Sequence, residues 1–131
     1  MEERQRSARV RAELMAATQR RESQQAQKLI DEFVRQVGEA GLPPVGLKAR
    51  TTSGQVVRTN VRGWYIKADH SVAVGVDGGY YSLTVFGGLV TKLRGVSLQP
   101  SPPPLIVGHG GKDGESGDLK DFLGRALSGG V

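Results

Sequence analysis

The stretch that decides the fold is residues 63–96, GWYIKADHSVAVGVDGGYYSLTVFGGLVTKLRGV. Its apolar and aromatic residues fall into short runs at residues 64–68, 72–76, 80–86 and 89–95, each of a length typical of a β-strand. The runs are separated by Asp69-His70-Ser71, Asp77-Gly78-Gly79 and Gly87-Gly88. Asp-Gly and Gly-Gly pairs favour hairpin turns, because both residues adopt positive φ at little cost. Connections this short predict antiparallel neighbours, since parallel pairing needs a long crossover.

Two more strands and a helix are predicted before this stretch. Residues 45–52 and 55–61 are separated by Ser53-Gly54, a turn dipeptide. Further upstream, apolar residues recur at intervals of three and four, which places them on one face of a helix. They are Ala26, Leu29, Ile30, Phe33, Val34 and Val37. Gly38 or Gly41 ends this helix, and Pro43-Pro44 prevents its continuation. The helix is expected to pack on the sheet.

The C-terminal third predicts a connector, a loop and a second helix. Residues 100–104, PSPPP, are predicted to form an extended connector, and residues 105–107 a short edge strand. Residues 108–117, GHGGKDGESG, form a glycine-rich loop. The final helix has Ser116 or Asp118 as its N-cap and ends at Gly129-Gly130. Its apolar face consists of Leu119, Phe122, Leu123, Ala126 and Leu127.

Alternation along the strands predicts two faces. The core face consists of Leu47, Ala49, Val57, Trp64, Ile66, Val72, Val74, Val76, Tyr81, Leu83, Val85, Leu89 and Leu93. Trp64, the single tryptophan, is expected to anchor the core against Phe33 or Phe122. The outward face is Lys48, Arg50, Arg58, Tyr65, Lys67, Tyr80, Ser82, Thr84, Lys92 and Arg94. A slip of one residue in any strand would exchange these faces.

The predicted fold class is α+β. It has an N-terminal amphipathic helix, a five- or six-stranded antiparallel meander that forms a curved sheet or half-barrel, and a C-terminal helix. Residues 1–24 are rich in helix-forming Arg, Gln, Glu and Ala, and are expected to form a helical or disordered arm. Residues 25–131 are expected to form a single α+β domain. Both helices should cover the apolar face of the sheet.

The composition restricts the class of protein. The 131 residues contain no cysteine, so neither disulfides nor thiolate metal sites are possible. The first 15 residues are charged throughout, unlike a secretory signal, and no apolar run reaches the ~18 residues of a membrane span. A cytoplasmic protein without membrane contact is therefore expected. The formal net charge is +5, and residues 45–99 hold seven Lys/Arg against two Asp/Glu. The basic excess lies in the predicted sheet.

No catalytic residue, cofactor or metal site is predicted. The loop at residues 108–117 lacks the Gly-Lys-Ser/Thr of a phosphate-binding loop, and Asp113, Glu115 and Asp118 would repel an anion there. These acids also lack the spacing of a calcium loop. The two histidines, His70 and His109, lie in a turn and in this loop. Adjacent Asp69-His70-Ser71 is not a triad, because triads are assembled in space.

Three segments carry a resemblance. They are GWYIKADHSVAVGVDGGYY, the proline stretch before LIVG, and GHGGKDGESGDL with the short helix after it. Together they resemble small uncharacterised proteins of high-GC actinobacteria, over roughly residues 45–127. The resemblance implies an actinobacterial, cytoplasmic protein, and it assigns no functional residue.

The outward face is the candidate binding surface. Its lysines and arginines could neutralise phosphates, and its tyrosines could stack on unpaired bases. The residues are Lys48, Arg50, Arg58, Tyr65, Lys67, Tyr80, Lys92 and Arg94. Three interpretations stay open for this face: a solvated surface, nucleic-acid binding, and binding of an acidic protein. For the whole chain, a non-catalytic interaction or adaptor protein ranks first, with an unknown protein partner or self-association through the arm. A nucleic-acid-binding protein ranks second and an enzyme third.

Overall fold

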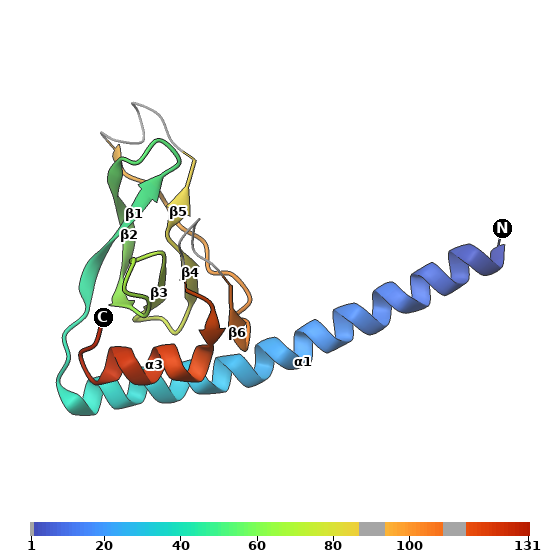
Figure 1. The fold of residues 1–131 in the computed structure, drawn as a ribbon, viewed down its shortest axis with the longest axis horizontal. Coiled ribbons are helices and arrows are strands. Elements are labelled where there is room, and N and C mark those ends of the chain that lie inside the picture. The colour runs from blue at the N-terminus through green and yellow to red at the C-terminus, as the bar shows by residue number, and fades with distance from the viewer. Residues whose placement is uncertain (1, 87–93, 109–114) are drawn as a thin grey trace.

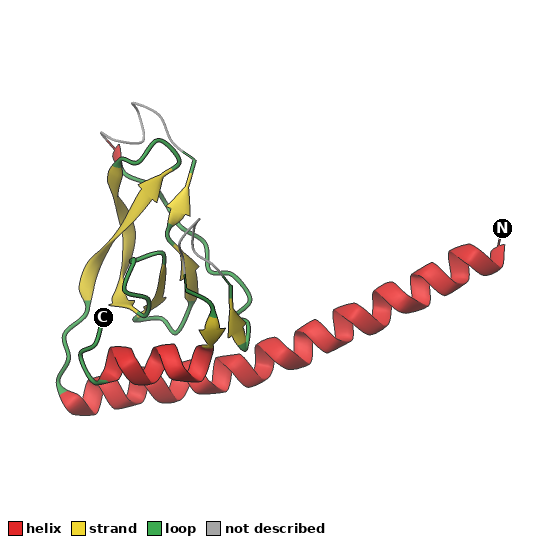
Figure 2. Cartoon of the chain, in the orientation of Figure 1, coloured by secondary structure: helices red, strands yellow, loops and turns green. Residues whose placement is uncertain are grey.

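The computed structural model describes residues 2–86, 94–108 and 115–131. A long helix and a shorter one lie on one side of a five-stranded sheet, and a two-stranded sheet lies beside them (Figures 1 and 2). The elements are α1 (Glu2–Ala40), β1 (Val45–Thr51), β2 (Val56–Tyr65), β3 (Val72–Gly75), β4 (Tyr80–Ser82), β5 (Thr84–Val85), β6 (Ile106–Val107), β7 (Gly117–Asp118) and α3 (Leu119–Leu127). The predicted α+β class is confirmed. The predicted strand at residues 89–95 lies largely outside the described residues.

Helix α1 is one continuous element. Its 39 residues correspond to a length of about 58 Å at 1.5 Å per residue. It crosses the predicted boundary after residue 24 without a break, and its N-terminal half projects away from the rest of the molecule (Figure 1). The helix ends at Gly41, whose φ is +70°, while the amide of Leu42 donates to the carbonyl of Val37 at 3.0 Å. This is the glycine stop expected before the two prolines.

The five-stranded sheet curls until its two edges are formed by the same stretch of chain. The strand order is β4-β3-β2-β1-β5, and only Leu83 separates β4 from β5. The amide of Leu83 donates to the carbonyl of Ser71 at 2.8 Å, and its own carbonyl accepts from the amide of Arg50 at 2.7 Å. The prediction that all neighbours are antiparallel is wrong for β5, which pairs parallel with β1. Parallel pairing is possible here because the chain reaches β1 by closing the ring instead of by a hairpin.

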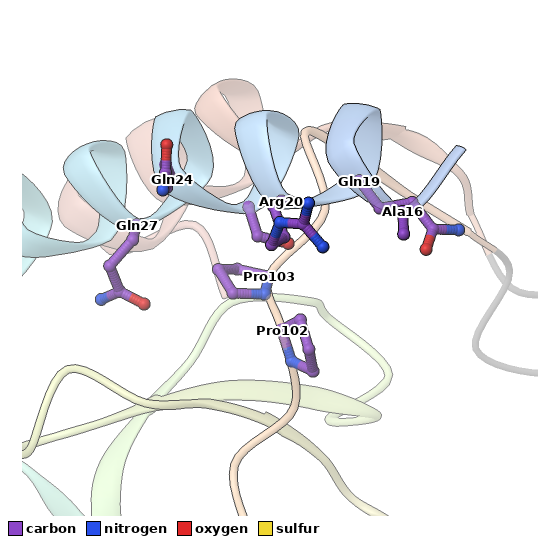
Figure 3. Close-up of a pocket in the computed structure, with 8 residues that line it drawn as sticks. Ala16, Gln19, Arg20, Gln24, Gln27, Pro102 and Pro103 are labelled. Atoms are coloured by element: carbon purple, nitrogen blue, oxygen red, sulfur yellow. The ribbon is translucent and has the colours of Figure 1, made fainter. Parts of the chain in front are cut away.

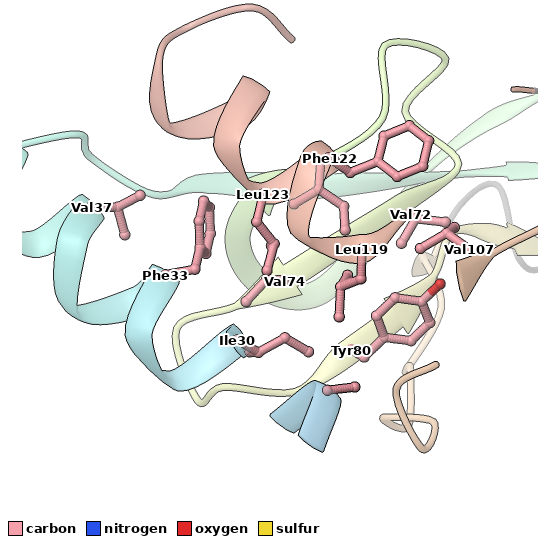
Figure 4. Close-up of a cluster of buried hydrophobic side chains, with 12 residues drawn as sticks. Ile30, Phe33, Val37, Val72, Val74, Tyr80, Val107, Leu119, Phe122 and Leu123 are labelled. Carbon is pink, nitrogen blue, oxygen red and sulfur yellow. The ribbon is translucent and has the colours of Figure 1, made fainter. Parts of the chain in front are cut away.

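The sheet contributes to one apolar cluster on each of its two faces, whereas the sequence predicted a single core face. The inner side of the ring is filled by Leu47, Ala49, Val57, Val61, Ala73, Tyr81 and Leu83. The outer side of β3, β4 and the end of β2 packs against both helices (Figure 4). The prediction that both helices cover an apolar face is therefore correct.

The predicted core set is divided between these two sides. The sequence predicts residues 55–61 and 64–68 as two separate strands, so inward and outward positions are assigned independently in each. Because β2 runs unbroken from Val56 to Tyr65, Val57 faces the inside of the ring and Trp64 faces the helices. Trp64 contacts Phe33, one of its two predicted partners, and the rings meet edge-to-face with centroids 6.0 Å apart. Val76, also assigned to the core, is exposed because it lies just beyond the end of β3.

The C-terminal region attaches α3 to the end of the sheet and to α1. The amide of Ser101 donates to the carbonyl of Tyr80, and the amide of Leu105 donates to the Glu22 carboxylate of α1 at 3.0 Å. The predicted edge strand is present as β6, which pairs with β7. Of the two predicted N-cap residues of α3, Ser116 and Asp118, the structure has Asp118, although its side chain makes no capping hydrogen bond. Gly129, with φ +83°, ends α3.

The turn between β3 and β4 is fixed by a tyrosine. The Tyr81 hydroxyl donates to the Asp77 carboxylate at 2.7 Å, and the Gly79 amide donates to the same side chain at 2.9 Å. Burial and the bond to Asp77 raise the pKa of Tyr81 to about 12. Burial opposes ionisation of Asp77, but the hydrogen bonds from Tyr81 and Gly79 lower its pKa.

We expect an absorbance titration of tyrosinate to contain a group that ionises near pH 12 and that Tyr81→Phe removes, so that the amplitude at high pH falls by one tyrosine. Burial also raises the pKa of Tyr80, which titrates in both chains. Because the folded pKa is raised, this tyrosine stabilises the fold fully below pH 10 and loses that contribution between about pH 10 and 12. A tyrosine signal near pH 12 that persists in Tyr81→Phe would contradict this assignment. The matched control is Tyr65→Phe, which should leave the step in place.

Candidate functional site

Four cations share the uncovered outer surface of β1 and β2, and we call this surface the basic face. They are Lys48, Arg50, Arg58 and Arg62. Lys48 lies directly opposite Arg58, and Gly46 lies opposite Arg62. Residues two apart on a strand point to the same side, so Lys48 and Arg50 are neighbours on β1. All four side chains are exposed.

The outer row of β2 changes character along the strand. Its first part, with Arg58, Asn60 and Arg62, is exposed, whereas Trp64 and the following Ile66 lie against the helices. The helices therefore cover one end of the outer surface and leave the basic end open. The only acids between residues 45 and 99 are Asp69 and Asp77, which lie in the turns on either side of β3. No carboxylate of the sheet lies among the four cations.

A bulge in β2 shapes the middle of the basic face. The pairing with β1 shifts between Gly46 and Lys48, and the Thr59 hydroxyl satisfies the displaced carbonyl of Leu47 at 2.7 Å. The segment at residues 94–98 docks on this bulge. The amide of Val96 donates to the carbonyl of Arg58, and the amide of Leu98 donates to the Asn60 side chain, both at 2.8 Å.

Docking of this segment creates a polar hollow of about 410 Å³ at the edge of the basic face. It is lined by Arg58, Thr59, Asn60, Arg94, Gly95, Val96 and Ser97. Gly95, at φ +80°, is required there, because a Cβ would lie 2.7 Å from the carbonyl oxygen of Arg58. Arg94 is thus brought beside Arg58, as the sequence-based prediction of a shared surface requires. Lys92 lies outside the described residues.

Lys67 does not belong to the basic face, and its predicted outward exposure is wrong. Its side chain is 2 % exposed. The amino group donates to the carbonyl of Gly108 at 3.2 Å and lies 5.6 Å from the ring centroid of Phe122. The physical reason is that β2 ends at Tyr65, so the alternation used to place Lys67 no longer applies two residues later.

The two predicted tyrosines are also absent from the basic face. Tyr80 does lie on the outer side, but it is buried, because the helices cover that part of the sheet. Tyr65 is half-buried and packs against the inner cluster. Its hydroxyl accepts a hydrogen bond from the amide of Lys48 at 2.9 Å, and its ring stacks on His70 with centroids 3.9 Å apart. Neither ring is placed to stack on a base bound at Arg58.

The structure adds two residues that sequence reasoning missed. Arg62 was overlooked because the strand was ended at residue 61, although its spacing from Arg58 and Asn60 follows the outward period of two. Phe86 is 88 % exposed directly after β5. Thr84 is exposed and pairs with Arg50, so alternation places Phe86 on the same outer side. The signal available in the sequence was its position two residues after Thr84, which continues the outward period of Ser82 and Thr84.

The Asp69-His70-Ser71 turn is held together by its own hydrogen bonds. The Asp69 carboxylate accepts from the Ser71 hydroxyl at 2.6 Å and from the Ser71 amide at 3.0 Å. Burial opposes ionisation of Asp69, but these bonds and the nearby Lys67 lower its pKa. His70 contacts Tyr65 and has φ +59°. Within the described residues, no group of three His, Asp or Glu side chains could hold a metal ion. His109 and most of the glycine-rich loop lie outside them.

A second hollow lies between α1 and the proline connector. It has a volume of about 500 Å³, and its lining is mostly apolar (Figure 3). The residues are Ala16, Gln19, Arg20, Ser23, Gln24, Gln27, Pro102 and Pro103. It begins where α1 leaves the body of the molecule.

Of the helices in the described parts of the chain, none is long and apolar enough to cross a membrane.

Comparisons with protein-family models, curated proteins and solved structures found no match to this chain. The resemblance to actinobacterial proteins therefore stays a prediction, and the functional argument rests on the geometry of the basic face.

Proposed function

We propose that this chain is a non-catalytic cytoplasmic binding protein and that the ligand of its basic face is nucleic acid. The observation that carries the proposal is the row of exposed Lys48, Arg50, Arg58 and Arg62 on two paired strands, neither of which contains an Asp or Glu. Cations two residues apart on one strand, such as Lys48 and Arg50, lie about 7 Å from each other along the chain, and facing cations such as Lys48 and Arg58 lie on strands about 5 Å apart. A polyanion with regularly spaced charges can contact several of them at once.

Phosphate contacts account for affinity at such a face. Each phosphate neutralised by Lys or Arg releases condensed counterions, so affinity falls steeply as salt rises. Lys48, Arg50, Arg58 and Arg62 all lie on strands, and an extended strand pair with exposed cations suits a backbone that tracks along it. Recognition would therefore depend little on base sequence.

Phe86 favours a single strand over a duplex. Its ring is exposed directly after β5, whose Thr84 pairs with Arg50, and a base can stack on it only when that base is unpaired. Such stacking contributes about 1–3 kcal/mol per base by alanine substitution. We therefore expect Phe86→Ala to weaken binding of single-stranded DNA or RNA and to leave duplex binding unchanged.

Reversing two neighbouring charges should abolish binding. Lys48→Glu with Arg58→Glu replaces a facing pair of cations by a facing pair of carboxylates in the middle of the basic face. In fluorescence anisotropy with a labelled oligonucleotide at low salt, the unaltered chain should bind and the double variant should not. For the unaltered chain, a plot of the logarithm of the affinity against the logarithm of the salt concentration should have a slope of about −0.7 for each phosphate contacted in a single strand.

The matched control places the same charge change elsewhere. Lys28→Glu with Lys120→Glu alters the net charge equally, at exposed positions on α1 and α3. This control should retain most of the affinity, because a specific face and not the total charge is responsible. Equal loss in both double variants would leave only non-specific attraction, and binding without salt dependence would contradict a phosphate ligand. If only acidic peptides bind, the ligand is an acidic protein.

A further inference from the structure

The N-terminal half of α1 carries apolar side chains that nothing in the described structure covers. Every described residue before Ala16 is exposed, including Val10 at 48 % and Leu14 at 61 %. This half projects into solvent (Figure 1). A helix of this kind gains most of its stability from packing, because isolated helices are marginal in water. A partner for the exposed side is therefore expected.

The exposed side matches itself when it is read in reverse. Residues at helical intervals of three and four along it are Glu3, Ser7, Val10, Leu14, Ala17 and Arg21. In an antiparallel pair whose two-fold axis lies level with Ala12, Val10 meets Leu14, Ser7 meets Ala17, and Glu3 meets Arg21 of the second copy. A parallel pair would instead place Arg21 beside Arg21 and Glu3 beside Glu3. Charge complementarity thus favours the antiparallel arrangement.

We propose that residues 3–21 of α1 bind the same segment of a second copy of this chain in an antiparallel helix pair. The contact side lies roughly 100–180° around the helix from buried Ala26, at about 100° per residue. The second copy therefore approaches the side of α1 that is turned away both from the sheet and from the hollow at Pro102. The Arg21 guanidinium donates one hydrogen bond to Thr18, and its other donors can reach Glu3 of the second copy.

Two adjacent substitutions test which side of the helix is used. Leu14→Glu and Met15→Glu introduce the same charge at residues that are 61 % and 65 % exposed, but only Leu14 lies on the proposed contact side. In sedimentation equilibrium over a concentration series, the unaltered chain should dimerise. Leu14→Glu should raise the dimer dissociation constant about tenfold or more, and Met15→Glu should leave it nearly unchanged. A chain that is monomeric throughout, or the reverse order of the two variants, would overturn the proposal.

Cross-linking tests the direction of the pair, because the chain has no cysteine of its own. Ser7→Cys and Ala17→Cys, made in separate chains and mixed under oxidising conditions, should give the mixed disulfide much faster than either chain alone gives a homodimer. A parallel pair would give the two homodimers. Glu3→Arg should weaken the dimer, and adding Arg21→Glu to the same chain should restore it. Failure of that rescue, with folding verified by circular dichroism, would contradict the proposed register.

Discussion

Replacing Gly63 by alanine is expected to destabilise the protein more than any other single methyl group added to the sheet. Gly63 lies on β2 directly opposite Gly75 of β3. A Cβ at residue 63 would lie 2.0 Å from the carbonyl oxygen of Val74 and 2.7 Å from the Cα of Gly75. Both are backbone atoms, so no side-chain rotation relieves the clash. Overpacking typically costs about 1–3 kcal/mol, and a clash with the backbone places this substitution at or above the upper end.

The control for this prediction is Gly46→Ala on the neighbouring strand. Gly46 also pairs with β2, yet a Cβ there has no atom within 4 Å. Urea unfolding should therefore show a large fall in the free energy of unfolding for Gly63→Ala and a change within about 0.5 kcal/mol for Gly46→Ala. Similar stability of the two variants would mean that β2 and β3 are not as closely apposed as the structure has them.

The close approach of Gly63 and Gly75 also shows why some features could be predicted from the sequence and others could not. The helix stripe of Ile30, Phe33 and Val37 and the turns at Asp77-Gly78 depend on residues that are neighbours in the chain. Local periodicity and turn chemistry therefore indicate them directly. Closure of the ring through Leu83 depends on hydrogen bonds to Ser71, which directly precedes β3, and to Arg50 of β1. Nothing local to Leu83 encodes that pairing.

The candidate site was predictable only where the strands are regular. Lys48, Arg50 and Arg58 lie on uninterrupted parts of β1 and β2, and alternation places them correctly on the outer side. Lys67 was misplaced because it lies two residues beyond the end of β2. Tyr80 was misplaced for another reason: its side of the sheet was right, but its cover by the helices is a tertiary feature. Exposure depends on what packs above a strand, which alternation does not report.

The basic face and the projecting helix segment occupy different parts of the molecule. The basic face lies on β1 and β2, whereas Leu14 belongs to the N-terminal half of α1. That half of the helix leaves the body of the molecule (Figure 1). The two proposals can therefore be tested separately, because Leu14→Glu should not alter binding of a short oligonucleotide to one chain. If the dimer forms, each assembly carries two basic faces. Longer oligonucleotides should then bind more tightly than short ones, and Leu14→Glu should remove only that advantage.

Two phenylalanines distinguish stability from binding. Phe33 is 2 % exposed, lies between α1 and the sheet, and contacts Trp64 edge-to-face. Phe33→Ala removes a buried ring and leaves a cavity, which typically costs about 3–5 kcal/mol. Loss of the aromatic contact is included in that figure, since such a pair contributes about 0.5–1.5 kcal/mol beyond burial. For a domain with a total stability of about 5–15 kcal/mol, this is a large fraction.

Phe86→Ala makes the same chemical change at a side chain that is 88 % exposed. Its free energy of unfolding should stay within about 0.5 kcal/mol of the unaltered chain, because little apolar surface is removed from the core. Under conditions where both variants are folded, we expect Phe33→Ala to retain single-strand affinity, because the cavity that it creates lies between α1 and Trp64 and removes none of the four cations. Phe86→Ala should lose it in part. Unchanged stability of Phe33→Ala would contradict the packing of α1 on the sheet. Full single-strand affinity in Phe86→Ala would remove base stacking from the proposed mode of binding. The phosphate contacts would then still be tested by the charge reversals at Lys48 and Arg58.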